Sequence, residues 1–371
     1  MAKLTTIMEF GMSKIVCFSG RMSKKGDAVE MVAGASVDWQ GEGQPFEDSA
    51  FLNALKKTVD ELNRKVRPVK KLSVAIPGSY TSIALSSAAI PIPEDVRAVT
   101  EAHVDDFIYS AENFKVPDGY ETLHRCPVTY QIDQRKVLDP VGKKGSVLTG
   151  EVSFVFAQKE LLQRISACFA ELRIEVEQFI ASPLAQGLSV IPAFTRDEIA
   201  VLVDCGYRTT DISIFQGDGM IYHGVVEMGS YDMIRAIAST LQAPMSQAEQ
   251  LKRQYVYGLD TMPGMDVIAR NEQGRGIRYP LQKVQEAMES NLIELLNIIK
   301  KVVYNGKTDC TEKTKIFFGG GAFVLNRGSR EFVQKIFTNP FEYIELELPY
   351  YSLPNFAGAY GTLDFAVHTT L

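Results

Sequence analysis

The sequence predicts an α/β fold made of two similar halves, with a small α+β subdomain inserted into the first half. Three observations support this prediction. Short β-branched segments alternate along the chain with segments of helical period, which is typical of helices layered on sheets. A second set of strands, similar to the first, begins at residue 199. Between the two sets, residues 79–157 change to an acidic helix and alternating strands.

The first half begins with a strand, a helix and a strand. The strands are predicted at 14–18 and 71–76, where β-branched and other apolar residues cluster. The helix between them has apolar residues at three- and four-residue spacing: Phe51, Leu52, Leu55, Val59, Leu62 and Val66. The uncharged stretch 72–93 contains Pro77, Gly78 and Pro91, so we predict two strands around a turn and not a membrane span.

The remaining elements follow the same pattern. The inserted subdomain is predicted from a helix at 94–112 and strands at 127–133 and 148–156. A helix at 159–172, a strand at 174–180 and a helix at 183–190 complete the first half. The second half has strands at 199–204, 211–215 and 220–226, a mostly helical region at 230–304 with a long helix at 281–303, a strand at 315–318 and a final helix at 355–368.

These elements predict four parts. The first half comprises residues 1–78 plus 158–196, and the inserted subdomain comprises 79–157. The second half comprises 197–229 plus 312–371, and a mostly helical subdomain comprises 230–311. A chain of 371 residues is long enough for several such parts.

Composition excludes several classes of function. Lys and Arg number 39 against 45 for Asp and Glu, a net charge of −6, so direct nucleic-acid binding is not expected. The five cysteines occur singly, with no CxxC pair, which argues against a disulfide framework or a structural zinc site. The N-terminal residues lack the pattern of a signal peptide. A cytoplasmic protein fits these features.

Two turns, about 195 residues apart, share one plan: a strand, an acid, any residue, a glycine and then a small hydroxyl residue. The first contains Glu9, Gly11, Ser13 and Lys14, and the second contains Asp204, Gly206, Arg208 and Thr209. Such turns direct N–H groups and hydroxyls at one point, which suits phosphate, and the acids Glu9 and Asp204 suit a hydrated Mg²⁺. Taken alone, each turn is more often an ordinary hairpin.

Two further elements complete a candidate nucleotide site. The strand at 315–318 leads into a glycine turn, where absent side chains let a base or ribose lie against the backbone of Gly319, Gly320 and Gly321. Glu249 and Lys252 lie three residues apart on a predicted helix and are suited to ribose hydroxyls. Together the four elements predict binding of ATP with Mg²⁺.

Their order resembles that of the actin and Hsp-type chaperone superfamily, in which two phosphate turns, a connecting helix and an adenosine turn surround ATP. Within it, the chain most resembles the bacterial cell-division FtsA family. The most specific match lies in the insert, at His124, the segment 127–133 (PVTYQID), the segment 139–146 (DPVGKKGS) and Leu148. Further matches are the segments 182–185 (SPLA) and 248–252 (AEQLK). The resemblance implies an actin-like two-lobed fold, with ribonuclease-H-like duplicated halves and an FtsA-type inserted subdomain.

The resemblance also implies a function. FtsA relatives are filament-forming adaptors that link FtsZ to the division machinery at the inner face of the membrane. The expected partners are therefore the FtsZ C-terminal peptide, further copies of the chain and other division proteins. Arg253, Lys300 and Lys301 are candidates for binding that acidic peptide. Relatives end in an amphipathic helix that this chain lacks, so we expect membrane contact to be indirect or through an anchor absent from this chain.

Several departures from the family concern the nucleotide chemistry. Glu9 replaces an aspartate, Tyr207 and Arg208 replace glycines, and Ser182 stands where relatives place the carboxylate that positions the attacking water. Arg208 either binds a phosphate, or fills the γ-phosphate space and pairs with Asp204 or Asp211.

We therefore predict weak or lost ATP hydrolysis and assign no catalytic residue. ATP and Mg²⁺ are the cofactors if the site is functional, and there is none if it has degenerated. An active ATPase of this superfamily and a pilus-assembly adaptor of the same fold are the alternatives.

Overall fold

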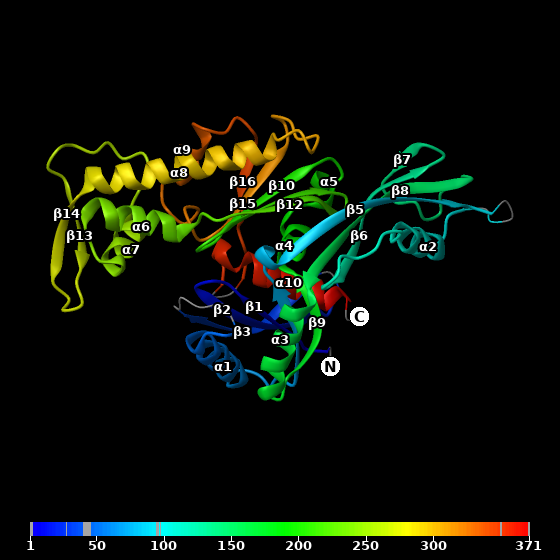
Figure 1. The fold of residues 1–371 in the computed structure, drawn as a ribbon, viewed down its shortest axis with the longest axis horizontal. Coiled ribbons are helices and arrows are strands. Elements are labelled where there is room, and N and C mark those ends of the chain that lie inside the picture. Colours follow the sequence, from blue (N-terminus) through cyan, green and yellow to red (C-terminus); the bar gives the residue numbers. More distant parts are fainter. Residues whose placement is uncertain are drawn as a thin grey trace. The chain divides into compact units, whose positions relative to one another are not determined.

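The structure, a computed structural model, describes residues 3–26, 28–39, 46–93, 96, 98–348 and 351–369. Its residues form two compact units (Figure 1). Unit 1 comprises Met1–Ala200, Ser213–Gly224 and Phe356–Leu371, and unit 2 comprises Val201–Ile212 and Val225–Asn355. The final helix, which the sequence groups with the second half, thus belongs to unit 1. The division into four parts stays a prediction.

The central sheet of unit 1 has the strand order β3-β2-β1-β4-β9. The antiparallel strands are β1 (Thr5–Phe10), β2 (Lys14–Met22) and β3 (Val29–Asp38). Next to them, β4 (Lys71–Ile76) runs parallel to β1, and β9 (Glu175–Ala181) runs parallel to β4. The predicted strands at 14–18, 71–76 and 174–180 are present, whereas the sequence analysis missed β3.

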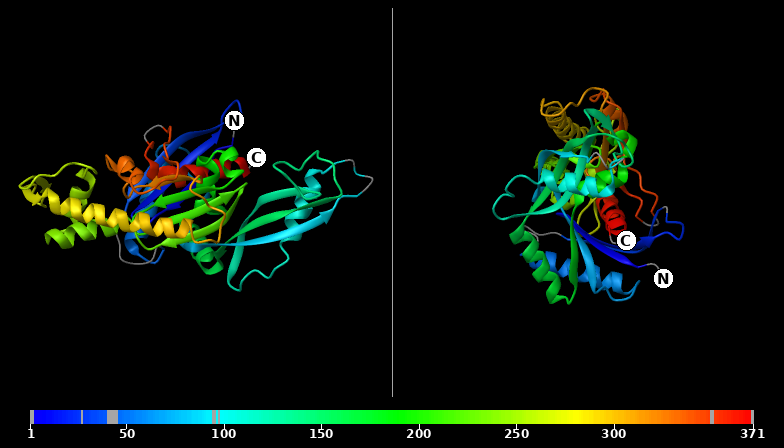
Figure 2. Two further views of the ribbon diagram at one scale, coloured as in Figure 1. Left: turned by 90° about the horizontal axis from the view of Figure 1, so that it is seen from above. Right: turned by 90° about the vertical axis from the view of Figure 1, so that its right-hand side faces the viewer.

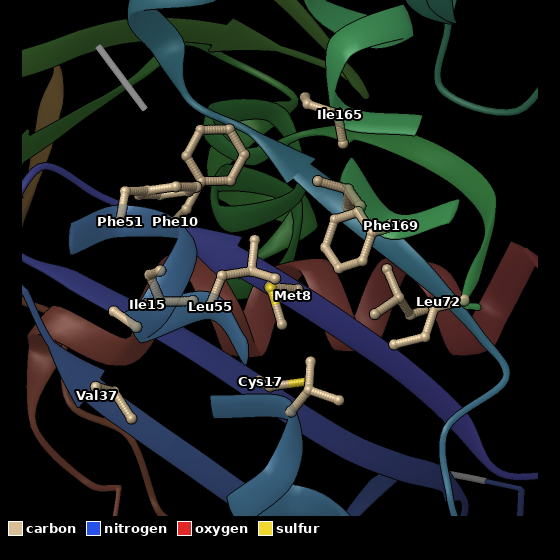
Figure 3. Close-up of a cluster of buried hydrophobic side chains, with 14 of the residues drawn as sticks. Met8, Phe10, Ile15, Cys17, Val37, Phe51, Leu55, Leu72, Ile165 and Phe169 are labelled. Atoms are coloured by element: carbon tan, nitrogen blue, oxygen red, sulfur yellow. The ribbon is translucent and has the colours of Figure 1, made fainter. Parts of the chain in front are cut away.

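Helices cover both faces of this sheet. On one face, α1 (Ser49–Asn63) and α3 (Lys159–Glu171) enclose a core that includes Met8, Leu55 and Phe169 (Figure 3). On the other face lie α4 (Ser182–Val190) and α10 (Ala357–Thr369), which follows the 3-10 turn Pro354–Phe356. These two helices pack closely, because a Cβ on Gly361 would lie 2.6 Å from Cα of Gln186. Helices that the sequence predicts therefore cover both faces of the sheet.

The inserted subdomain is a separate sheet with the strand order β5-β8-β6-β7. Its strands are β5 (Thr81–Pro91), β6 (Tyr120–Ile132), β7 (Arg135–Val137) and β8 (Val147–Gln158), and the 3-10 turn Gly78–Tyr80 leads into β5. Figure 2 shows β5 along one rim of this sheet. The helix α2 (Glu101–Ala111) packs Phe107 against Phe154 and Leu148.

The start of α2 differs from the prediction. The helix begins at Glu101 because the hydroxyl of Thr100 accepts the His103 N–H as its cap. Residues 98–100 of the predicted helix are therefore non-helical, and residues 94, 95 and 97 lie outside the described part of the chain.

Buried polar contacts join the insert to the rest of unit 1. His124 Nε2 in β6 accepts the Ala181 N–H at 3.0 Å, and burial lowers the pKa of His124 to about 4. Ser153 Oγ in β8 donates to the Met220 carbonyl at 2.6 Å. His223 Nε2 lies 3.0 Å from the Gly78 carbonyl. The neutral ring of His124 is therefore part of this junction.

The second five-stranded sheet has the order β12-β11-β10-β15-β16. Its strands are β10 (Ala200–Cys205), β11 (Thr210–Gln216), β12 (Gly219–Val226), β15 (Lys315–Gly320) and β16 (Phe341–Tyr343). The short helix α5 (Ala193–Arg196) precedes β10, α6 (Ser230–Leu241), α7 (Met245–Gln254) and α8 (Leu281–Val303) lie between β12 and β15, and α9 (Ser329–Gln334) lies between β15 and β16. The long helix predicted at 281–303 is confirmed.

The region 230–304 is not helical throughout. An antiparallel hairpin, β13 (Asp266–Arg270) with β14 (Gly276–Pro280), separates α7 from α8. Its tight turn is held by the Asn271 N–H, which donates to the Arg275 carbonyl at 2.9 Å. No helix in the described residues is both long enough and apolar enough to cross a membrane.

Candidate nucleotide site

The first predicted turn joins β1 to β2 in unit 1. The Gly11 N–H donates to the Lys14 carbonyl at 2.8 Å, which closes the turn. Trp39, just after β3, donates its ring N–H to the Gly11 carbonyl at 2.9 Å and its backbone N–H to the Ser13 carbonyl at 3.0 Å. The turn is therefore fixed by a residue that the sequence analysis did not single out.

Glu9 lies within β1 and points toward the starts of two helices. Ser182, the first residue of α4, donates its hydroxyl hydrogen to Glu9 Oε1 at 3.0 Å. A Cβ on Gly358, in the first turn of α10, would lie only 2.1 Å from the same oxygen. The carboxylate thus occupies the space that a side chain at 358 would need, near two helix N-termini whose dipoles favour negative charge.

Lys14 also contacts the beginning of α10. Its ammonium nitrogen lies 4.5 Å from the ring centroid of Phe356, within the range of a cation–π contact. The two charged residues of the first turn, Glu9 and Lys14, therefore both pack against the segment that starts the C-terminal helix. The sequence did not predict this contact, because the partners are about 345 residues apart.

The second predicted turn joins β10 to β11 in unit 2. The Gly206 N–H donates to the Thr209 carbonyl at 2.9 Å. The start of α6 supports the turn, because the N–H groups of Ser230 and Tyr231 donate to the carbonyls of Gly206 and Tyr207 at 3.0 and 2.8 Å. The backbone of this turn is therefore held in place by α6.

The two bulky residues of the second turn form a stack with Tyr231. The guanidinium carbon of Arg208 lies 3.8 Å from the ring centroid of Tyr231, and the Tyr207 and Tyr231 rings are 5.7 Å apart. Both distances lie in the range of favourable contacts, cation–π for Arg208 with Tyr231 and ring–ring for Tyr207 with Tyr231. Tyr231 lies in the first turn of α6, and no sequence motif indicated it.

The glycine turn lies against the second phosphate turn. Gly320 ends β15 with φ +83°, and a Cβ there would lie 2.2 Å from the Cys205 carbonyl oxygen and 2.5 Å from Asp204 Oδ1. The N–H groups of Gly321 and Ala322 donate to that carbonyl at 3.0 and 3.1 Å. Unit 2 therefore brings two of the predicted elements together, and only glycine fits at 320.

Lys252 is attached to the same turn. It is buried on α7, and its ammonium group donates to the Ala322 carbonyl. Burial, together with the nearby charge of Arg253, lowers the pKa of Lys252 to about 8, although Glu249 opposes the shift. Glu249 itself forms an ion pair with Arg253 at 2.5 Å. The helix that carries the predicted ribose ligands is thus connected to the glycine turn.

The three basic candidates for partner binding differ in their surroundings. Arg253 pairs with Glu249, and Lys300, in the last turn of α8, donates to the Ile336 carbonyl at 3.0 Å and lies 5.6 Å from the Phe337 ring. Lys301 is exposed. Two of the three candidates therefore stabilise unit 2 itself.

The predicted adenosine elements lie together in unit 2, and their polar groups already have partners there. The Gly321 and Ala322 N–H groups bond the Cys205 carbonyl, the Ala322 carbonyl accepts from Lys252, and the Glu249 carboxylate pairs with Arg253. In each unit, a side chain longer than the family pattern stands at the phosphate turn, namely Glu9 in unit 1 and Arg208 in unit 2. Each has contacts within its own unit.

Solved structures show which fold this is. The chain is similar to the PilM-PilN type IV pilus biogenesis complex, with a TM-score of 0.65 and 16% identity over 98% of each chain. It is also similar to MreB 5 of Spiroplasma citri bound to AMPPNP (TM-score 0.54, 10% identity, 100% and 99% covered) and to the MamK double helical filament (0.53, 12%, 98% of each). These similarities confirm the predicted actin-like fold.

Sequence comparisons define the family. A model described as "SHS2 domain inserted in FTSA" matches residues 78–156, and one described as "Cell division protein FtsA" matches residues 201–361. The FtsA of Escherichia coli K12 is 24% identical over 308 residues, covering 81% of this chain and 73% of that protein. For Pseudomonas aeruginosa FtsA the identity is 24% over 356 residues, covering 94% and 84%. The chain belongs to the FtsA family of cell-division proteins, within the actin-like ATPase superfamily.

Proposed function

We propose that this protein is an FtsA-like adaptor that links FtsZ to the division machinery at the cytoplasmic face of the membrane at the division site. In this proposal it binds the FtsZ C-terminal peptide, associates with itself into filaments and hydrolyses ATP weakly or not at all. Membership of the FtsA family supports the adaptor role. The side chains at the two phosphate turns support the loss of hydrolysis.

The bond between Ser182 and Glu9 carries the proposal about hydrolysis. A neutral hydroxyl cannot take a proton from water as a carboxylate does, and Ser182 already donates its hydrogen to Glu9. In unit 2, the Arg208 guanidinium stacks on Tyr231 where relatives have glycine. The start of α4 therefore offers no carboxylate to activate water, and the second turn carries bulky side chains where the relatives' glycines let the phosphates approach.

A bound nucleotide would have identifiable ligands. In unit 2, Gly319, Gly320 and Gly321 would hold the adenosine, Glu249 the ribose, and Asp204 is the candidate Mg²⁺ ligand. In unit 1, Glu9 is the candidate Mg²⁺ ligand. Lys252 would position the glycine turn through the Ala322 carbonyl. Bound ATP would supply the γ-phosphate, the group that hydrolysis would release.

Calorimetric titration with ATP and Mg²⁺, combined with a phosphate-release assay, tests the nucleotide part. We expect weak or undetectable binding and no release above a protein-free control. The variant Ser182→Glu, which restores a carboxylate at the start of α4, serves as the comparison. Micromolar binding with brisk phosphate release by the natural chain would contradict the proposal and favour an active ATPase.

Peptide binding tests the adaptor part. Fluorescence anisotropy with a labelled FtsZ C-terminal peptide should show saturable binding, and a scrambled peptide of the same composition should not bind. The similarity to PilM over 98% of both chains, at 16% identity, shows a shared fold and gives the pilus alternative only weak support. Binding of a PilN peptide without binding of the FtsZ peptide would therefore replace division by pilus assembly.

A further inference from the structure

The strand β5 is an outer strand of the inserted sheet, and it carries no charged side chain. Its eleven residues are Thr, Ser, Ile, Ala, Leu and a terminal Pro. It pairs with β8 over its whole length without a register shift, so no bulge interrupts the edge. Folded proteins ordinarily protect an edge with charges, bulges, prolines or short strands, because an open edge offers its backbone to another strand.

The other outer strands in the described part of the chain do show such protection. Six of them, β3, β7, β9, β13, β14 and β16, include charged residues, for example Glu30, Arg135, Glu175, Asp266, Arg278 and Glu342. The remaining one, β12, is covered by contacts within unit 1, where Ser153 bonds the Met220 carbonyl and His223 lies beside the Gly78 carbonyl. Among the outer strands of the described residues, β5 therefore differs from the others because its edge lacks such protection.

The pairing with β8 shows which backbone groups of β5 point outward. The Ile92 N–H donates to the Ser146 carbonyl at 2.8 Å, in the same register as the ladder of β5 with β8. Because an antiparallel ladder alternates, even-numbered residues pair with β8, and odd-numbered residues direct their N–H and C=O groups outward. Among these, Leu85, Ser87 and Ala89 also have exposed side chains.

We propose that the outer edge of β5 pairs antiparallel with β5 of a second copy of this chain, so that two four-stranded sheets form one continuous sheet. Centred on Ser86, this pairing uses all of β5 and sets Leu85 opposite Ser87, and Ile83 opposite Ala89, of the second copy. No like charges meet, and the same patch serves both copies, as two-fold symmetry requires. The inference rests on the self-association that the proposed function includes, and it assigns a surface to one two-fold contact between copies. A filament also needs a heterologous contact, because a two-fold contact closes on itself.

Substitutions at Ser87 test the pairing by analytical ultracentrifugation of the full chain. Ser87→Pro removes an outward N–H without removing a bond to β8, and Ser87→Lys sets two like charges near the two-fold axis. Each should weaken dimerisation by roughly tenfold or more. Gln131→Lys is the matched control, because Gln131 is exposed on the same face of the sheet but lies on the inner strand β6. Circular dichroism checks that each variant folds.

Cysteine cross-linking tests the register. Residues 86 of the two copies form a non-hydrogen-bonded pair at about 4.5 Å between Cα atoms, close enough for a disulfide. Cys168 and Cys310 are the two cysteines that are not buried, so both are first replaced by serine. In that background, Ser86→Cys should cross-link on mild oxidation. Ser82→Cys should not, because residue 82 lies opposite residue 90.

A chain that is monomeric at every concentration tested overturns the proposal, as does a dimer that persists unchanged in both Ser87 variants. Equal cross-linking at positions 82 and 86 overturns the register. The experiment separates this inference from the adaptor role, because monomeric Ser87 variants that still bind the FtsZ peptide support both proposals. A natural chain that is monomeric yet binds the peptide removes the β5 pairing alone.

Discussion

The carboxylate of Glu9 and the glycine at 358 share one small space in unit 1. A Cβ at 358 would lie 2.1 Å from Glu9 Oε1, far inside van der Waals contact. In a helix, alanine is otherwise favoured over glycine by about 1 kcal/mol. The absence of a side chain at 358 is therefore explained by Glu9 and by Ser182, whose hydroxyl is 3.0 Å from the same Cβ position.

We predict that Gly358→Ala destabilises the natural protein by about 1–3 kcal/mol, because the new methyl group displaces the Glu9 carboxylate. In a Glu9→Ala background the same substitution should cost much less, since the contact is gone. Urea unfolding of the four proteins in this double-mutant cycle measures the coupling. Gly11→Ala is the control, because its Cβ would lie 3.6 Å from the nearest atom. Equal costs in both backgrounds would contradict the argument.

Lys252 makes stability depend on pH in a predictable direction. Its pKa is lowered to about 8 in the folded state, mainly by burial, from the ordinary 10.5. Between about pH 8 and pH 10.5 the unfolded chain binds more protons than the folded chain, so the free energy of unfolding rises with pH. Below about pH 8 Lys252 is protonated in both states and makes no contribution to the pH dependence. Relative to Lys252→Met, the natural protein should gain up to roughly 3 kcal/mol between pH 7.5 and pH 10.5. Urea unfolding of both proteins at several pH values measures this difference, and parallel curves would refute it.

At the scale of elements, local patterns predicted most helices and strands, and their failures have physical causes. The hairpin β13–β14 was missed because its five-residue strands carry charges on an exposed face, as in Asp266, Arg270 and Arg278. Such strands lack the apolar alternation of half-buried sheets. The start of α2 was misplaced because Thr100 caps the helix, a signal that the acidic run before it obscured.

The second phosphate turn is an element whose side chains can be exchanged for those of its relatives. Tyr207→Gly with Arg208→Gly removes the stack on Tyr231 while leaving Gly206, Thr209 and the support from α6. We expect ATP affinity to rise by about tenfold or more, since glycines expose the N–H groups that cradle phosphate. Calorimetry with ATP and Mg²⁺ measures the gain. A loss of affinity would instead identify Arg208 as a phosphate ligand, the alternative that its stacked position disfavours.

At the scale of the whole molecule, the sequence predicted the actin-like fold, because short motifs in a fixed order carry the resemblance to that superfamily, whereas nucleotide binding by those motifs stays a prediction. It did not predict what those residues contact. The partners of Glu9 are on α4 and α10, and the partner of Lys252 is a carbonyl 70 residues away. These groups are brought together only by the packing of segments that are distant in the sequence, and no local sequence pattern indicates such contacts.

Because the whole chain carries a net charge of −6, the proposed binding of an acidic peptide requires a local basic site. Among the basic candidates, Lys301 is exposed, whereas charge reversal of Lys300 would also break its bond to the Ile336 carbonyl. We therefore predict that Lys301→Glu weakens binding of the FtsZ C-terminal peptide by about two- to fivefold, without lowering the melting temperature appreciably.

Lys283→Glu is the matched control for this prediction. Lys283 is an exposed lysine on the same helix, 18 residues before Lys301, which places it about 27 Å away along α8. Both variants have the same net charge, so a local site is distinguished from a general electrostatic effect. Anisotropy titrations at low and moderate salt should separate the two variants, with the larger difference at low salt because exposed charges are screened. Equal weakening by both would move the peptide site away from the end of α8.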